Sequence, residues 1–215
     1  MKNQIVRPMF TTPFFFGEIE YDYEIPTEGF VDGHNREGVV SPNVINLDLP
    51  ELEEKILECA KYLISEVGFV DQPMKVNQLW LNAYDETRSG LPVHWHQNCS
   101  WSGTYFPVDA NHTTWYVNPN SGYQNAYLPD NRVEEGQKVF SDFNSDYFPL
   151  TQMKKGMLLI HPSWIGHSVT WNGGEPSYSI SFDIAYTGPI GSKEYGSYNV
   201  GTYTYNTNKR RIQRV

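Results

Sequence analysis

The sequence predicts a mainly β fold: a double-stranded β-helix of the jelly-roll or cupin-like type, with one supporting N-terminal helix. Three observations predict it. Aromatic residues make up 15% of the chain and charged residues only 19%, a balance typical of β-rich globular proteins. One helical pattern precedes residue 70, and short strand-like segments separated by turn residues follow residue 74. No repeat or linker divides the 215 residues, so we expect a single domain over residues 1–215.

The first third of the chain predicts an edge strand, a turn-rich segment and the best helix. Prolines interrupt the apolar run of residues 8–20, which places this segment near a sheet edge. Turn signals dominate residues 21–47. Apolar residues then recur at helical spacing, with Asp48 as the expected N-cap, Pro50 in the first turn and Gly68 as the stop.

The remaining sequence predicts strands and turns. The expected strands are 76–84, 92–97, 102–108, 112–117, 137–141, 156–161, 166–171, 177–187 and 200–206. Residues 118–135 form a long polar loop between them, and in this fold class such a loop could cover the mouth of a barrel.

Charge and cysteine content narrow the partners and the compartment. The net charge of −9 argues against nucleic acid, because phosphate binding needs a basic surface. The sequence has no apolar run of about 18 residues that could span a membrane, and its first residues lack the core of a signal peptide. Cys59 and Cys99 are too few for a secreted disulfide framework. We therefore expect a cytoplasmic protein.

Three histidines form a candidate metal site. His94 and His96 stand two residues apart on a predicted strand, so their side chains lie on the same side, about 6–7 Å apart along the chain. His167 follows a Pro-Ser-Trp turn and opens a later strand, from which it can deliver a third imidazole. Three imidazoles from two segments, with an open coordination face, indicate catalysis more than scaffolding. The alternative is that the pair beside Trp95 consists of ordinary solvent-facing histidines.

The other candidate residues give weaker evidence for a functional site. We expect His161 in the core or behind the metal ligands, and we interpret His34 and His112 as incidental. Cys99 could compete as a thiolate ligand and favour zinc, but no C-x-x-C accompanies it. The sequence contains no G-x-S-x-G, P-loop or G-x-G-x-x-G, which leaves serine hydrolase and nucleotide chemistry unsupported.

An ordered set of segments resembles the 2-oxoglutarate/Fe(II)-dependent oxygenases that carry H-x-H, S-G-x-Y-Y and P-S-W-x-x-H. The resemblance covers most of residues 8–187. Its segments are Met9–Phe16, Trp80–Tyr84, His94–His96, Ser102–Phe106, Gly156–Val169 and Tyr178–Asp183.

The resemblance implies Fe(II) in a double-stranded β-helix, with 2-oxoglutarate as cosubstrate. The wider superfamily holds iron with two histidines and a carboxylate, in H-x-D/E…H, and His96 occupies the carboxylate position here. The metal ligands would then be His94, His96 and His167, or an acid such as Asp109 would have to take part.

The resemblance also indicates the cosubstrate site. The family binds the C5 carboxylate of 2-oxoglutarate with an arginine about ten residues after the distal histidine, and Ser177 stands there in this chain. Hydroxyl groups could bind the carboxylate without neutralising it, or Arg88 or Arg132 could replace the missing arginine. The expected cofactor-binding residues are Tyr105, Ser177, Ser179 and Asn82, with Thr104 as a further hydroxyl.

Most aromatic residues on the strands are expected to pack in the core. Trp101 and Trp115, near the metal strands, are expected to line the substrate cleft.

The function predicted first is an Fe(II)/2-oxoglutarate-dependent dioxygenase, a hydroxylase of an unidentified small molecule or peptide. One alternative is a cupin-like three-histidine metalloprotein that does not use 2-oxoglutarate, as Ser177 and His96 suggest. Another is a non-catalytic phage binding module on the same fold. Members of the family occur in phages, so the compartment would be the host cytoplasm if a phage encodes the chain. Edge strands and the aromatic N-terminal segment are compatible with a homodimer.

Overall fold

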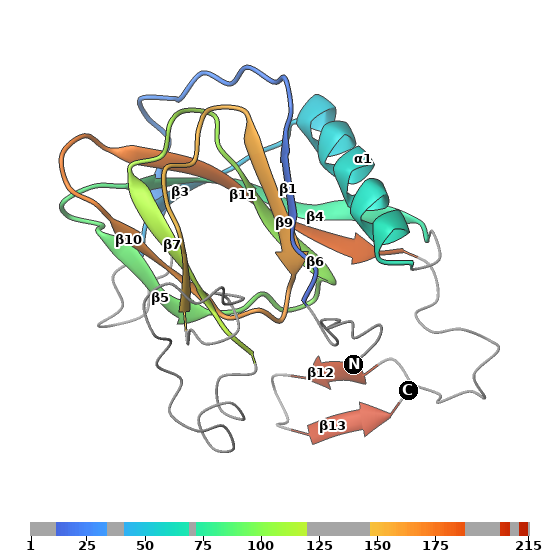
Figure 1. The fold of residues 1–215 in the computed structure, drawn as a ribbon. Coiled ribbons are helices and arrows are strands. Elements are labelled where there is room, and N and C mark those ends of the chain that lie inside the picture. Colours follow the sequence, from blue (N-terminus) through green and yellow to red (C-terminus); the bar gives the residue numbers. More distant parts are fainter. Residues whose placement is uncertain are drawn as a thin grey trace, which may run out of the picture.

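Two facing antiparallel β-sheets form the body of the protein (Figure 1). The computed structural model describes residues 12–33, 41–68, 72–119 and 147–187, and the backbone of 203–206 and 211–214. The seven-stranded sheet contains β1 (Phe15–Glu18), β2 (Val31–Asp32), β3 (Asn43–Asn46), β4 (Met74–Tyr84), β6 (Trp101–Tyr105), β9 (Met157–Pro162) and β11 (Ser177–Tyr186). The four-stranded sheet contains β5 (Gly90–His94), β7 (His112–Val117), β8 (Tyr147–Leu150) and β10 (His167–Trp171).

The strand order is that of a double-stranded β-helix. Strands β4, β11, β6 and β9 are neighbours in the larger sheet, and β5, β10, β7 and β8 are neighbours in the smaller one. The chain crosses repeatedly between the two sheets, and every neighbouring pair within them is antiparallel. The predicted mainly β fold is confirmed. A separate two-stranded sheet pairs β12 (Tyr203–Asn206) with β13 (Arg211–Arg214).

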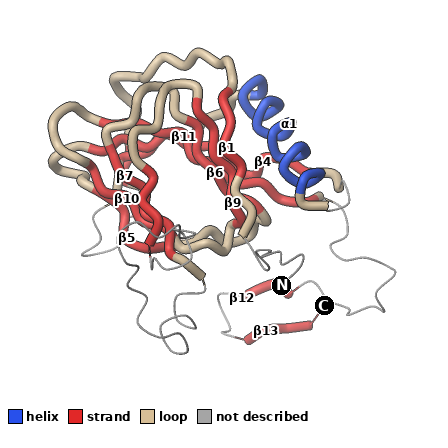
Figure 2. The backbone as a smooth tube through the Cα atoms, in the orientation of Figure 1, coloured by secondary structure: helices blue, strands red, loops and turns tan. Residues whose placement is uncertain are grey.

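Helix α1 (Pro50–Glu66) is the supporting helix expected from the sequence, and it lies outside the barrel, against the larger sheet (Figure 2). Pro50 occupies its first turn as expected, and Gly68 follows its end with φ +77°. The prediction for Asp48 is wrong, because the N-cap is Leu49 and no side chain caps the helix. The buried face of α1 consists of Leu52, Ile56, Ala60, Leu63 and Ile64.

The main hydrophobic core lies between α1 and the outer face of the larger sheet. Residues that alternate along its strands supply the sheet side of this core, because successive side chains of a strand point to opposite faces. These residues are Leu79, Leu81, Trp101, Tyr105, Leu158, Ile160, Ile180, Phe182 and Ile184. Their neighbours in sequence on β4, β6 and β11 face the barrel interior, where Asn82, Thr104 and Ser179 line a cavity. The outer face is therefore apolar and the inner face largely polar.

Most predicted strands agree with the structure within a few residues, and β7 has the predicted bounds. Strand β5 ends at His94 rather than at residue 97. Sequence analysis missed β3, which follows a turn-rich stretch, and β8, which contains Pro149. The expected strand 137–141, nearly all of the loop 118–135, and His34 and Arg132 lie outside the described residues.

Among the described residues, no helix is long and apolar enough to cross a membrane. The single domain expected for residues 1–215 stays a prediction.

Candidate metal centre

Three histidines converge at one end of the barrel. His94 and His167 are direct partners on the antiparallel strands β5 and β10, with ring centroids 4.3 Å apart. His96 lies two residues beyond β5, where its backbone N–H donates to the carbonyl oxygen of Ser163 at 3.0 Å. Its ring centroid lies 5.3 Å from that of His94 and 5.2 Å from that of His167. One donor nitrogen from each ring lies within 4.8 Å of the others, so the structure brings the three predicted ligands together.

Backbone carbonyls orient two of these rings. The Nδ1 atom of His94 lies 2.9 Å from the carbonyl oxygen of Pro92, and the Nδ1 atom of His167 lies 3.2 Å from that of Ile165. A carbonyl oxygen only accepts hydrogen bonds, so this contact assigns the proton to Nδ1. The lone pair of Nε2 then remains for a metal, as is usual in histidine-ligated centres.

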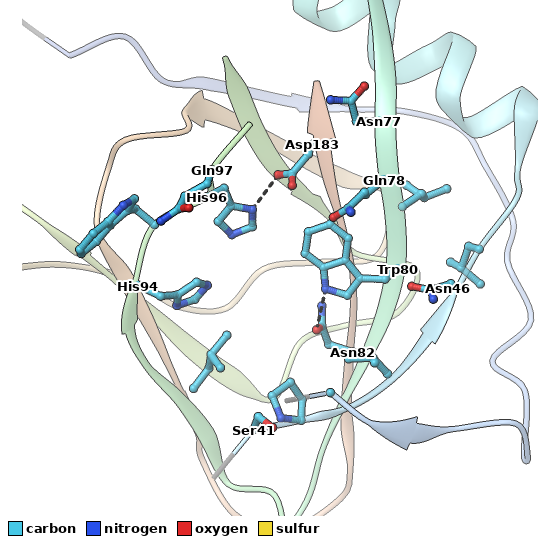
Figure 3. A pocket seen from close by; sticks show the side chains of 17 residues that line it. Ser41, Asn46, Asn77, Gln78, Trp80, Asn82, His94, His96, Gln97 and Asp183 are labelled. Carbon is cyan, nitrogen blue, oxygen red and sulfur yellow. Dashed lines mark hydrogen bonds and ion pairs between the residues drawn. The ribbon is translucent and has the colours of Figure 1, made fainter. Parts of the chain in front are cut away.

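Asp183 orients the third ring, and sequence analysis gave this residue no role. It lies on β11, in the opposite sheet, and its Oδ1 atom accepts a hydrogen bond from Nδ1 of His96 at 2.6 Å (Figure 3). Ser102 Oγ lies 3.0 Å from the same nitrogen and donates to the carbonyl oxygen of Phe182. The side chains of His96 and Asp183 are only 10% and 9% exposed, so little water competes for this contact. Trp80 stacks against the other side of the His96 ring, with centroids 5.7 Å apart.

Burial keeps the interior imidazoles neutral. Desolvation, with help from the neighbouring histidines, lowers the pKa of His167 well below its usual range. Desolvation lowers the pKa of His161, which packs edge-on to His167, to about 4. Burial and the nearby Asp183 carboxylate raise the pKa of Cys99 to about 12, so its thiol stays protonated and is a poor metal ligand. A neutral imidazole is the form that binds a metal.

The donor set fits a divalent transition metal: three imidazole nitrogens from two segments, with a carboxylate behind one of them. The proposed alternative acid, Asp109, does not lie at this site. Its carboxylate is exposed on the surface and binds Lys154 Nζ at 2.8 Å and the Lys155 backbone N–H at 3.0 Å. Asp183 is therefore the acid placed beside the histidines.

An open cleft of about 570 Å³ begins at His94 and His96 (Figure 3). Uncharged side chains dominate its lining, and Asp183 is the only acid among the described residues that line it. Its amide-bearing residues are Asn46, Asn77, Gln78, Asn82 and Gln97. Its aromatic residues are Trp80, whose Nε1 donates to Asn82 Oδ1 at 3.1 Å, and Trp95, which is 59% exposed.

A narrower cavity continues from the histidines into the barrel. Trp80, Asn82, Leu91, His94 and His96 line both the cleft and this cavity. Of the expected cofactor-binding residues, Asn82 and Ser179 line the cavity, together with Thr104. Asn82 Nδ2 also donates to Ser181 Oγ at 2.9 Å. These contacts give the cavity a lining of hydroxyl and amide groups that can bind an oxyanion.

Tyr105 and Trp101 do not face the site. Both side chains belong to the core beneath α1: the Tyr105 hydroxyl donates to the carbonyl oxygen of Tyr21, and Trp101 Nε1 donates to the Tyr186 hydroxyl at 3.2 Å. The reason is strand alternation: Ser102 and Thr104 point inward, so residues 101 and 105 of β6 point outward.

Two further candidates also lie away from the histidines. Trp115 points outward for the same reason, since its neighbours Thr114 and Tyr116 face the interior, and it is 36% exposed. The guanidinium of Arg88 pairs with Asp32 and does not line the cavity.

Fold and site together define a jelly-roll protein with a candidate three-histidine metal site at the mouth of its barrel. Residues 78–183 match the family described as "Putative 2OG-Fe(II) oxygenase". The matched region contains all three histidines and Asp183. This match, which spans just under half of the chain, confirms the resemblance and the enzyme class expected from the sequence.

Several solved structures resemble this chain. The α-ketoglutarate-dependent epimerase SnoN from nogalamycin biosynthesis has 16% identity and a TM-score of 0.49, over 74% of this chain and 66% of SnoN. A prolyl-4-hydroxylase of Pseudomonas putida has 11% identity and a TM-score of 0.47, over 83% of this chain and 95% of that enzyme. HygX of Streptomyces hygroscopicus, solved with nickel, 2-oxoglutarate and hygromycin B, has 13% identity and a TM-score of 0.46, over 82% of this chain and 84% of HygX. No curated protein sequence matches the chain.

Proposed function

We propose that this protein is an Fe(II)/2-oxoglutarate-dependent hydroxylase whose iron ligands are His94, His96 and His167. One observation carries the proposal: three imidazoles each bring one ring nitrogen within 4.8 Å of the others, at the mouth of an open cleft and inside the region that matches the oxygenase family. The centre has protein ligands on one side and space on the other, which is the arrangement of a catalytic rather than a structural metal site.

The residues of the protein hold this centre and set the charge around it. When bound, iron and 2-oxoglutarate would supply the oxidising chemistry, with O2 consumed and succinate and CO2 released as an aliphatic C–H is hydroxylated. The hydrogen bond from His96 to Asp183 fixes the ring and makes Nε2 a stronger donor. The carboxylate also supplies, one imidazole away, negative charge that a third histidine ligand lacks.

The cleft favours a substrate without strong charge. Asp183 is its only acid, that carboxylate already binds His96, and no lysine or arginine lines the cleft within the described part of the chain. Amide side chains and Trp95 offer hydrogen bonds and an apolar surface to a small molecule or a peptide.

Ser177 favours a second candidate function: a three-histidine metalloenzyme that does not use 2-oxoglutarate. In the described residues no cation lines the inner cavity where the family's arginine would lie. The two functions differ in one measurable property, the binding of 2-oxoglutarate to the metal-loaded protein.

Anaerobic titration of the Fe(II)-loaded protein with 2-oxoglutarate separates them. We expect a weak metal-to-ligand charge-transfer band in the visible, absent in His167→Ala and retained in Trp115→Phe, whose side chain faces outward. Iron binding without the band would favour the second function. Iron binding that survives loss of His167 would remove the proposed metal centre altogether.

We also propose a cytoplasmic location. Cys59 and Cys99 are both free, which suits a reducing compartment.

A further inference from the structure

The residue at the family's arginine position is not alone in the interior. Ser177 Oγ accepts the backbone N–H of Asn111 at 2.7 Å and lies 2.8 Å from Nδ1 of His112. His112 begins β7, is 2% exposed, and packs between the rings of Tyr84 and Phe106. A serine in place of an arginine leaves room for this imidazole.

His112 and the metal centre share one cavity. The inner cavity is lined by the three proposed metal ligands at one end and by His112 within the barrel. Hydroxyl groups of Thr104, Thr114, Ser179 and Ser181 complete its polar lining. The free space is small, about 30 Å³, so a ligand enters only as lining side chains move apart.

We propose that His112 takes the place of the missing arginine: its imidazole gains a proton and binds the carboxylate of 2-oxoglutarate farthest from the metal. The proposal rests on the proposed function and names the residue that would complete its cosubstrate site. His112 is then a binding residue, and Ser177 positions it through the contact at Nδ1.

The charge must come from His112, because none of the described groups that face it is charged. The groups that face it are Tyr84 on β4, Phe106 after β6 and Ser177 on β11. Burial raises the pKa of Tyr84, so this phenol stays neutral. On the neighbouring strand β10, Trp171 is the register partner of His112 and carries no charge.

Protonation of His112 is therefore coupled to anion binding. Without ligand, desolvation lowers the pKa of His112 to about 4, and the ring is neutral at pH 7. A carboxylate in contact with the ring favours the charged form and raises this pKa. Between the free and the bound pKa, affinity should fall about tenfold for each unit of rising pH, since one proton is taken up with the ligand.

Calorimetry of the Fe(II)-loaded protein under anaerobic conditions tests this coupling. Titration with 2-oxoglutarate at pH 7, in buffers of different ionisation enthalpy, should report the uptake of about one proton. The matched ligand is 2-oxopentanoate, which can chelate the metal identically but lacks the far carboxylate. It should bind about 10- to 100-fold more weakly, the effect of one charge-assisted hydrogen bond, and without proton uptake.

Two variants isolate the residue. His112→Gln should weaken 2-oxoglutarate binding to the level of 2-oxopentanoate and abolish proton uptake. In His112→Ala/Ser177→Arg, the guanidinium should restore affinity, again without proton uptake. This second variant keeps the test decisive if the glutamine variant fails to fold.

The outcomes distinguish this inference from the proposed function. If both oxo acids bind wild-type protein equally, or if His112→Gln still takes up a proton, then His112 does not bind the carboxylate. If neither oxo acid gives the charge-transfer band, the proposed function itself fails.

Discussion

Asp183→Asn removes one negative charge from behind His96 with almost no change of shape. The asparagine oxygen can still accept from Nδ1 of His96, so the loss is mainly that of the charge in a 2.6 Å contact between two nearly buried side chains. A charge-assisted hydrogen bond in such a place contributes roughly 1.5–3 kcal/mol. Loss of the carboxylate behind a ligating histidine typically weakens metal binding about 10- to 100-fold, which is about 1.4–2.7 kcal/mol. Both estimates predict the same range.

Competition with a chromophoric chelator under anaerobic conditions measures the Fe(II) affinity of this variant. Asp109→Asn is the matched control, because it makes the same change at an exposed carboxylate that binds Lys154. Circular dichroism of the metal-free proteins checks that both fold. An Asp183→Asn affinity within twofold of both wild type and the control would refute the argument that this carboxylate strengthens His96 as a ligand.

Three further predictions follow from the fold. Gly103→Ala should destabilise the protein by about 1–3 kcal/mol in urea unfolding, because a Cβ there would overlap the Leu159 carbonyl oxygen and the Phe182 ring. A variant as stable as wild type would show that the strands can move apart at this position. Tyr105→Phe should leave 2-oxoglutarate affinity unchanged in the anaerobic titration, since its hydroxyl lies on the outer face, and a clear loss of affinity would contradict that placement. The pKa of His161 is about 4 in the folded state and about 6.5 in the unfolded state, so unfolding takes up a proton between these two pH values. Lowering the pH from 7 to 4 should therefore reduce the free energy of unfolding by about 3 kcal/mol through this residue. The loss of unfolding free energy between pH 7 and pH 5 should be smaller in His161→Gln than in wild type, and an equal loss would argue against a buried neutral ring.

The sequence was sufficient for the fold class and for grouping three histidines into one candidate metal site. Strand alternation, turn residues and the spacing of His94, His96 and His167 are local signals, and the structure brings these three side chains together as they indicate. Roles on β6 were harder to predict. Four of its five residues are buried, because the strand packs under α1 on one face and lines the barrel on the other. A strand buried on both faces gives no sequence signal for which face is the interior, so Trp101 and Tyr105 were assigned to the wrong one.

Contacts between distant strands account for the remaining gaps. Asp183 closes a recognisable segment, but its partner His96 lies 87 positions away in the other half of the fold. His112 looked incidental at the start of a strand, and it is buried because Ser177, 65 positions away, leaves space beside it. Neither contact follows from periodicity or spacing. Both depend on how the two sheets are stacked.

The three candidate metal ligands are connected to both sheets, which would affect how a metal-loaded protein unfolds. His94 and His167 belong to the smaller sheet, whereas His96 is tied through Asp183 to the larger one. An ion bound to all three would add a cross-link at this edge of the sandwich, beside the backbone hydrogen bond from His96 to Ser163. Because such an ion binds the folded chain and not the unfolded one, free metal at 100 times its Kd would add about 2.7 kcal/mol to the stability. Cellular iron supply would then set the protein's lifetime as well as its activity, and iron-starved cells would hold a shorter-lived form of it.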